Sequence, residues 1–194
     1  MTLGETIKEL RVRTGVSVME CKKALEEAGG DLAAAEKILA GKFGGMAARK
    51  AAREARDGVI DVYLHPNAKI GVILELNSET DFVARNPAFK DLAHDIALHI
   101  AAMNPRYRAT EDITADVKAR ERKDIEAEVA KMGESGVLAK NNVAEKLSLR
   151  LQEISLMSQP FIKDQNKKIS DLIEEAIGKF GENIKIGRFT RYSI

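Results

Sequence analysis

An α+β fold is predicted, with a three-helix bundle at the N-terminus and then a core in which helices pack on one face of a small three-stranded antiparallel sheet. The first forty residues place apolar side chains at helical spacing between helix-capping signals. Residues 58–76 alternate apolar and other side chains around a turn, which is typical of a β-hairpin. Helical spacing follows, and alternation returns only near the C-terminus. This segregation of helices from strands indicates the α+β class.

Three short helices are predicted within residues 1–42. Thr2 and Ser17 each precede a glutamate by three residues, which is capping-box spacing, and Asp31 is a third helix cap. Glycines at positions 15, 29 and 30 end the first two helices. The side chains expected to face inward are Leu3, Ile7, Leu10, Cys21, Ala24, Leu25, Ala28, Leu32, Ala35 and Leu39. Helices this small and rich in alanine can close-pack into a very small bundle.

Residues 43–57 are expected to form a basic linker with helical character. Gly44 and Gly45 loosen it, whereas the AARKAAREAR stretch has high helix propensity. Its basic side chains would suit either RNA contact or a solvated helix. We favour the solvated helix because phosphate binders usually carry a larger basic excess, and the net charge of the chain is only +1. No direct binding of nucleic acid is therefore expected.

The core is expected to span residues 58–194. One face of the second hairpin strand carries Ile70, Val72, Leu74 and Leu76. The third strand is predicted around Ile184 and Ile186, and Gly187 marks a bulge that would reset its faces. Helices are predicted from residue 87 to about 103, from about 114, from about 142 to 157, and from about 170 to 180.

The segment TDFVARN, residues 80–86, connects the second strand to the first core helix. Asn86 followed by Pro87 is a helix cap with proline at the first helical position. Asp81 and Phe82 are therefore expected on a tight turn between rigid elements. In one interpretation Phe82 folds into the core and Asp81 satisfies turn amides, as burial statistics favour. In the other interpretation both contact a partner, because connections of this kind often carry function.

Composition restricts the class of protein. The 194 residues are 44% hydrophobic and 31% charged, which suits packed domains with a well-solvated surface. No apolar run approaches the length of a membrane span, and the N-terminus lacks the layout of a secretory signal. The one cysteine, Cys21, excludes an internal disulfide and fits a reducing compartment. A cytoplasmic protein is expected.

The residue patterns of common enzymes are missing from the sequence. His94 and His99 are five residues apart, so they do not share a helical face, and one cysteine provides no Cys/His metal spacing. Glu79 and Asp81 could pair at a strand end, but nothing supplies further metal ligands. No glycine-rich phosphate loop precedes a helix. We therefore expect no catalytic residues, cofactor or metal, and we expect His99 to be a hydrogen-bonded residue in or beside the core.

Several strings of residues together resemble one family. They are RTGVSVMECKKALEEAGGD, ELNSETDFVARN, LAHDIALHIAAMNP, SQPF and GENI, and they span the chain. The family they resemble is that of elongation factor Ts, the guanine-nucleotide exchange factor for elongation factor Tu. TDFVARN is a highly specific string in that setting. The resemblance implies a bundle of the ubiquitin-associated type, which is a binding module, followed by an α+β core.

The resemblance also implies a mechanism. The chain would bind elongation factor Tu in its GDP-bound and nucleotide-free forms and promote GDP release so that GTP can bind. Near the partner's Mg²⁺ site, Phe82 would wedge side chains apart until the metal coordination is lost. The residues expected to make this contact are Thr80, Asp81, Phe82 and Val83. An adaptor that binds another protein through the bundle, and an RNA-binding accessory protein, are the alternatives.

Val18 and Met19 begin the second predicted helix. Helical spacing places Met19 on the polar face, where a flexible thioether is either a partner contact or a harmless exposed residue. The same spacing aligns Val18 with the inner face. The resemblance implies that both residues contact the nucleotide-binding domain of the partner. Many members have a small residue and a Met-Met pair there, so Val18 is a conservative departure.

The chain resembles the short members of the family. It has one copy of the core subdomain, where longer members carry two copies and a helical hairpin. The short kind resembles proteins that pair, which implies a homodimer held by the core, with a C-terminal strand near Phe189 and Tyr192 able to join across a two-fold axis. Between residues 132 and 151 the sequence departs from the family pattern, because SLRL replaces a glycine-containing part.

Overall fold

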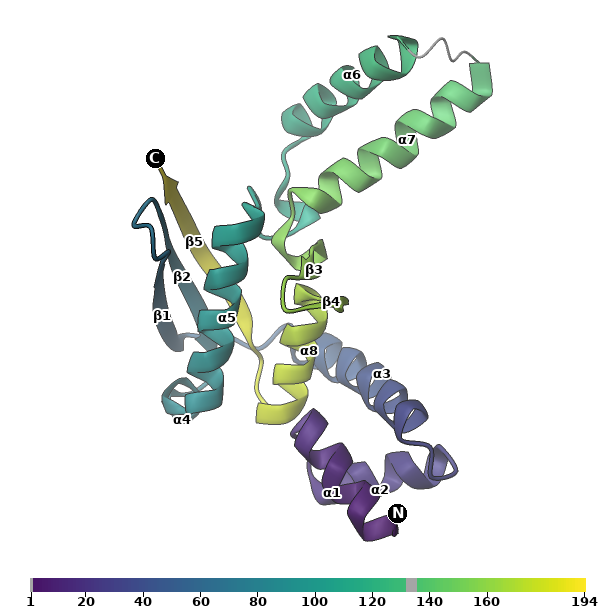
Figure 1. Cartoon of the computed structure of the whole chain (residues 1–194), viewed down its shortest axis with the longest axis vertical. Helices are drawn as coiled ribbons and strands as arrows, with labels where there is room; N and C mark the ends of the chain where they lie inside the picture. The colour runs from purple at the N-terminus through teal and green to yellow at the C-terminus, as the bar shows by residue number, and fades with distance from the viewer. Residues whose placement is uncertain (1, 132–135) are drawn as a thin grey trace.

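The computed structural model describes residues 2–131 and 136–194 and confirms the α+β class. Figure 1 shows the sheet on one side of the molecule, the bundle at the lower end and a helical hairpin at the upper end. The helices are α1 (Leu3–Thr14), α2 (Val18–Glu27), α3 (Leu32–Lys50), α4 (Asp81–Arg85), α5 (Pro87–Met103), α6 (Ala115–Lys131), α7 (Gly136–Glu153) and α8 (Ile169–Phe180). The strands are β1 (Asp57–Leu64), β2 (Ile70–Ser78), β3 (Pro160–Phe161), β4 (Asp164–Lys168) and β5 (Lys185–Ser193).

The bundle of α1, α2 and α3 forms where the capping signals predict it. Thr2 and Glu5 form a reciprocal capping box, and the side chains of Ser17 and Asp31 each accept a backbone hydrogen bond at a helix start. The bundle has its own apolar core, formed by Leu10, Val16, Cys21, Ala24, Leu25, Ala35, Leu39 and Phe43. Leu3 was expected to face inward, but it is about half exposed.

The third helix of the bundle is longer than predicted. Gly44 and Gly45 do not loosen it, and α3 continues to Lys50. Its C-terminal part packs against α8, where the ring of Phe43 lies over Gly178. Beyond that contact, the Lys50 ammonium group donates a hydrogen bond to the carbonyl oxygen of Gly181. A continuous helix packed on the core therefore joins the bundle to the rest of the chain.

The three-stranded sheet has the order β1-β2-β5, with antiparallel pairing throughout. The predicted bulge is present, because the register of β2 and β5 shifts between Leu74 and Leu76, opposite Gly187. α5 and α8 lie on one side of the sheet (Figure 1). The core between them includes Val72, Leu74, Leu76, Phe89, Ile96, Ile100, Ile173, Ile177, Ile184 and Ile186. As predicted for a half-buried strand, Val72, Leu74 and Leu76 on the inner face of β2 are buried, with Ile70 partly buried, while Ile73 on its outer face is exposed.

The helical hairpin and a short strand pair of the core differ from the prediction. α6 and α7 pack together as a helical hairpin around Ile125, Val129 and Val143, although such a hairpin was expected only in the longer members. α7 also covers Gly136–Glu153 rather than residues 142–157; the start of the atypical segment, residues 132–135, lies outside the described residues. The short pair β3 and β4 was not predicted.

His99 is fully buried on α5, as the sequence suggested. Its Nε2 lies 2.9 Å from Gln159 Oε1, and the amide of Ile162 donates to its Nδ1 at 3.2 Å. Since Nδ1 accepts, the proton lies on Nε2, and burial lowers the pKa of His99. His99 is therefore a neutral structural residue that ties α5 to the segment around β3.

The contact between α3 and α8 yields a test. A Cβ added at Gly178 would come within 2.2 Å of the Phe43 ring, so Gly178→Ala should destabilise the protein by about 1–3 kcal/mol. Gly45→Ala is the matched control, because a Cβ there meets nothing within 4 Å and alanine favours helix by up to about 1 kcal/mol. Denaturant unfolding measures both. Equal stabilities of the two variants would contradict this packing.

Candidate functional site

The segment TDFVARN forms a short helix rather than the tight turn that was predicted. It follows the end of β2 directly, and α4 covers Asp81–Arg85. Asn86 ends α4 and caps α5 through a hydrogen bond from the amide of Ala88 at 2.9 Å. Two consecutive elements thus hold α4 between them. We call its beginning together with the preceding residue, residues 80–83, the α4 tip.

Phe82 is the most informative side chain of the α4 tip. It is 85% exposed, whereas the next two residues, Val83 and Ala84, are buried against the core. The interpretation that placed Phe82 in the core is therefore wrong. Burial of Val83 and Ala84 fixes the inner side of α4, and this directs the aromatic ring outward. A large aromatic side chain held in water by a rigid support is typical of a binding surface.

Asp81 does not satisfy turn amides. Its carboxylate forms an ion pair with Arg85 one helical turn later, at 2.8 Å. Both side chains are substantially exposed, so the pair adds little stability, and a partner can replace it at small cost. Asp81 therefore presents an accessible negative charge beside the exposed ring of Phe82.

Glu182 is a residue of this site to which sequence reasoning gave no role. Its carboxylate accepts hydrogen bonds from the amide and the hydroxyl of Thr80, at 3.0 and 2.6 Å. Beside it, the amide of Asn183 donates to Glu79 at 2.6 Å. Both residues belong to the string GENI, which contributed to the family resemblance. The partners in these contacts are 102 and 104 residues apart in the sequence, so local patterns could not predict them.

Val18 and Met19 lie at the start of α2 and are 49% and 62% exposed. The alignment of Val18 with the inner face of the bundle was misleading. Figure 1 places α1 and α2 at the lower end of the molecule and α4 at the lower edge of the core, beside the start of α5. Both groups of residues that the sequence singled out thus include exposed apolar side chains, Val18 and Met19 on α2 and Phe82 on α4.

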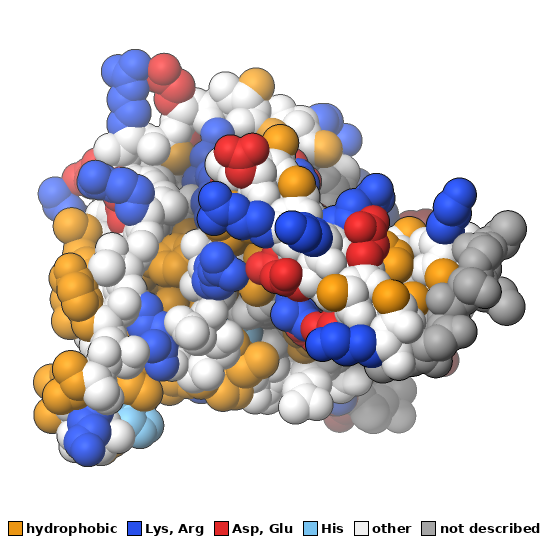
Figure 2. Space-filling model, turned by 90° about the horizontal axis from the view of Figure 1, so that it is seen from above, with side chains coloured by type: hydrophobic (Ala, Val, Ile, Leu, Met, Phe, Trp, Pro, Cys, Tyr) orange, Lys and Arg blue, Asp and Glu red, His pale blue; other side chains and the backbone are white. Residues whose placement is uncertain are grey.

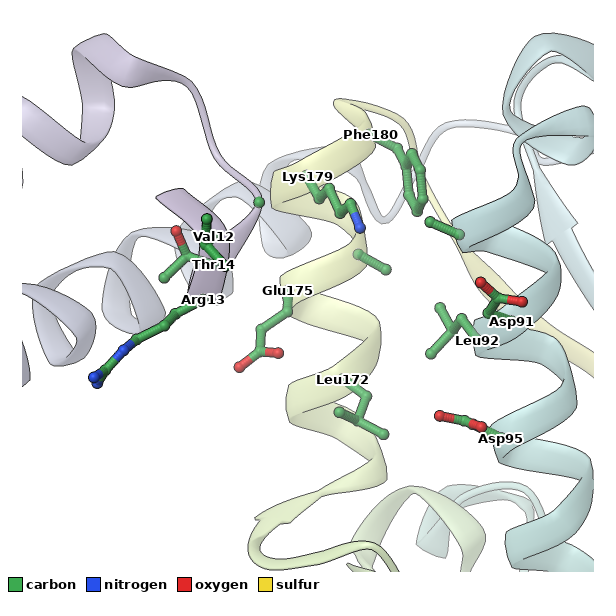
Figure 3. A pocket seen from close by; sticks show the side chains of 13 residues that line it. Val12, Arg13, Thr14, Asp91, Leu92, Asp95, Leu172, Glu175, Lys179 and Phe180 are labelled. Atoms are coloured by element: carbon green, nitrogen blue, oxygen red, sulfur yellow. The ribbon is translucent and has the colours of Figure 1, made fainter. Parts of the chain in front are cut away.

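A cleft of about 350 Å³ lies between the end of α1 and the facing sides of α5 and α8. Figure 3 shows Arg13 on one side of it, Asp91 and Asp95 on the other, and Glu175 between them. Asp95 and Glu175 form ion pairs with lysines 163 and 167, at 2.7 and 2.6 Å. Within residues 2–131 and 136–194, no cluster of three or more His, Cys, Asp or Glu could hold a metal ion.

The remaining reactive group is unsuited to catalysis. Cys21 is fully buried in the bundle, and burial raises the pKa of its thiol, so the reactive thiolate is disfavoured. No helix in the described part of the chain is long and apolar enough to cross a membrane. Exposed apolar side chains on α2 and α4 are the feature typical of a surface that binds another macromolecule.

Comparison with known proteins identifies the family. The family model described as "Elongation factor TS" matches residues 2–194. The chain is 48% identical to elongation factor Ts of Thermodesulfovibrio yellowstonii over 190 residues, covering 98% of this chain and 94% of that protein. It is 43% identical to elongation factor Ts of Rubrobacter xylanophilus and 46% identical to that of Fervidobacterium nodosum, with 98% of this chain covered and 97% and 96% of those proteins. The chain belongs to the elongation factor Ts family, whose role is nucleotide exchange on elongation factor Tu in translation elongation.

The exposure of Phe82 predicts the effect of its removal on stability. Phe82→Ala should change the free energy of unfolding by less than about 0.5 kcal/mol, because the ring is exposed and forms no part of the core. Phe89→Ala is the matched comparison on the adjoining helix. Phe89 is fully buried, with its ring 5.9 Å from that of Phe180, so its loss should cost about 3–5 kcal/mol. Thermal and denaturant unfolding of both variants decide the question, and a large loss for Phe82→Ala would place its ring in the core.

Proposed function

We propose that this chain is a guanine-nucleotide exchange factor that binds elongation factor Tu in its GDP-bound and nucleotide-free forms. In this proposal the α4 tip enters the partner beside its Mg²⁺ site. Phe82 separates side chains there, Mg²⁺ coordination is lost, and GDP leaves so that GTP can bind. The observation that carries the proposal is the 85% exposure of Phe82 on a helix anchored to the core. Thr80 and Asp81 complete the contact, whereas Val83, which was expected to take part in it, is buried and supports the tip from the core.

The energetics of exchange explain why an aromatic wedge suits this role. A nucleotide held with nanomolar affinity represents about 12 kcal/mol of binding free energy. Part of that energy comes from Mg²⁺, which bridges phosphate oxygens to protein. The exchange factor weakens nucleotide binding by a certain ratio, and by linkage the nucleotide weakens binding of the exchange factor by the same ratio. Burial of one phenylalanine side chain contributes roughly 1.5–3 kcal/mol, which is a useful part of this coupling.

We propose a second contact through the bundle. Val18 and Met19 are exposed apolar side chains on α2. They would contact the nucleotide-binding domain of the partner on the side that lies far from its Mg²⁺ site. In this proposal residues 1–42 and 58–194 act as two binding units joined by residues 43–57. The packing of α3 on α8 would transmit force between them. The role involves no making or breaking of covalent bonds, and it places the protein in the cytoplasm, where elongation occurs.

Release of fluorescent GDP from purified elongation factor Tu tests the proposal. The wild-type chain should accelerate release strongly, and Phe82→Ala should lower the accelerated rate by about 10- to 100-fold, the equivalent of the lost apolar contact. Leu149→Ala is the control, because Leu149 is also an exposed apolar residue but lies on the hairpin, away from α4. Failure of the wild-type chain to accelerate release would refute the function.

We propose further that the chain forms a homodimer through its core. The outer face of the sheet is open, and it carries exposed apolar residues that the register brings together, since Val62 lies opposite Ile73 and Leu64 opposite Gly71. Tyr192 continues the row on β5. Figure 2 shows hydrophobic side chains gathered along the side of the molecule where the sheet lies. β5 is also an edge strand, so either its edge or this face can meet a second copy.

Light scattering at micromolar concentration tests the dimer. The wild-type mass should be about twice the 21.3 kDa of one chain. Val62→Lys, which places a charge on the open face of the sheet, should lower the mass toward that of a single chain, whereas Leu149→Lys on the hairpin should not. A wild-type mass near 21.3 kDa at every concentration would exclude the dimer.

A further inference from the structure

We infer that Glu182 is a positioning residue for nucleotide exchange, which holds the α4 tip in the orientation that presents Phe82. The inference rests on the proposed function and assigns a role to a residue outside the TDFVARN segment. Its starting point is the length of α4, which has only five residues. A helix this short does not hold its own shape in water, because helix nucleation is unfavourable and few hydrogen bonds follow it. Something outside α4 must therefore fix its start.

The sequence of α4 cannot supply the usual fixing interaction. In a capping box, the third helical residue is a glutamate or glutamine that accepts a hydrogen bond from the amide of the N-cap residue. In α4 the N-cap residue is Thr80, and the third helical residue is Val83, which has no acceptor. The side chain of Thr80 also accepts no capping hydrogen bond. Neither of the two hydrogen bonds of a capping box is therefore formed by residues within the Thr80–Val83 segment.

Glu182 supplies the missing acceptor from a distant part of the chain. Its Oε2 accepts from the Thr80 amide at 3.0 Å, and its Oε1 accepts from the Thr80 hydroxyl at 2.6 Å. Because both carboxylate oxygens are used, the pair fixes an orientation as well as a distance. The carbonyl oxygen of Thr80 accepts a third bond, from the Ser78 hydroxyl at 3.0 Å. Thr80 is thus held on both sides immediately before Asp81 and Phe82.

A neighbouring pair of hydrogen bonds does a different task. The Asn183 amide donates to Glu79 at 2.6 Å, and the Asn183 side chain donates to the carbonyl oxygen of Arg53 at 2.6 Å. Asn183 is 2% exposed, so these bonds anchor the C-terminal segment in the fold. The bonds between Thr80 and Glu182 lie in an exposed environment. Exposed hydrogen bonds contribute little to global stability, so loss of Glu182 should loosen the tip without unfolding the protein.

A loosened tip would lower exchange without removing the surface that binds the partner. After binding, Phe82 would have to be ordered in the step that releases GDP, and the cost of ordering one side chain and its short support lowers the rate of that step about 3- to 10-fold. The loss should fall on the maximal rate of GDP release at saturating factor, because α2 and the rest of the core still bind. The concentration of factor that gives half of that rate should change little.

The kinetic experiment uses the full-length Glu182→Ala chain in the GDP-release assay with elongation factor Tu. We expect a maximal rate that is 3- to 10-fold lower, a nearly unchanged half-saturating concentration and an unchanged melting temperature. Asp112→Ala is the matched control. Asp112 is also an exposed carboxylate that accepts several hydrogen bonds, from Arg108 and the amide of Ala109, but it lies before α6. Wild-type exchange by Glu182→Ala, or a loss that follows its unfolded fraction, would overturn the inference.

A double-mutant comparison separates positioning from a direct contact. If Glu182 acts only by placing Phe82, then Glu182→Ala should cause no further loss in the Phe82→Ala background. A full further loss in that background would overturn the inference, because Glu182 would then act independently of the ring.

A third measurement distinguishes failure of the inference from failure of the proposed function. The chain contains three tyrosines and no tryptophan, so Phe82→Trp places a single tryptophan at the tip, which can be excited selectively at wavelengths that tyrosine does not absorb. Adding Glu182→Ala should lower its limiting fluorescence anisotropy, with or without any exchange partner, whereas Asp112→Ala should not. Unchanged anisotropy would overturn the role of Glu182 even if the chain proves to be an exchange factor. Absence of accelerated GDP release by the wild type, with the anisotropy change present, would refute only the proposed function.

Discussion

The central strand β2 is the element on which the rest of the core depends. It is paired on both edges and buried on one face, so its position and its register are fixed. Val72, Leu74 and Leu76 form the surface against which α5 packs, and they share one apolar core with Ile173 and Ile177 of α8. The strand then runs through Ser78 directly into α4. The α4 tip therefore begins at the end of a strand whose position is fixed by pairing on both edges, although the tip itself is short and exposed.

Apolar side chains are left uncovered at the α4 tip, at the start of α2 and on the outer face of the sheet, among other places, and each exposure carries a free-energy cost. Burying a side chain such as Phe82 would stabilise a protein by roughly 1.5–3 kcal/mol, and the fold forgoes that stabilisation at the tip, at the start of α2 and on the outer face of the sheet. The helices cover only the inner face of the sheet because both α5 and α8 pack there. Unused apolar surface on rigid elements is the physical signature of contacts completed by other macromolecules.

Periodicity and capping were enough to predict most of the fold, because they act between residues close in sequence. The caps at Ser17 and Asp31, the bulge near Gly187 and the burial of His99 all followed from local patterns. Short elements were not predicted, because α4 and the β3–β4 pair are too small for a periodic signal. The prediction that Gly44 loosens the chain was also wrong, because packing of α3 on α8 outweighs the low helix propensity of single glycines. The exposure of Phe82 follows from the burial of Val83 and Ala84. The spacing of apolar residues in so short a segment does not predict which of them is buried.

The contact between Thr80 and Glu182 explains how a short exposed element can remain ordered. Local sequence does not complete the cap of α4, and a carboxylate from the segment between α8 and β5 completes it instead. That segment is itself anchored by Asn183, and β5 then pairs with β2. The strand that carries the tip, β2, pairs with β5, the strand that follows Glu182, so hydrogen-bonded pairing limits how far Thr80 and Glu182 can separate. Support of the tip by β2 on one side and by the segment before β5 on the other, rather than by its own helix, reconciles the exposure of Phe82 with a fixed direction.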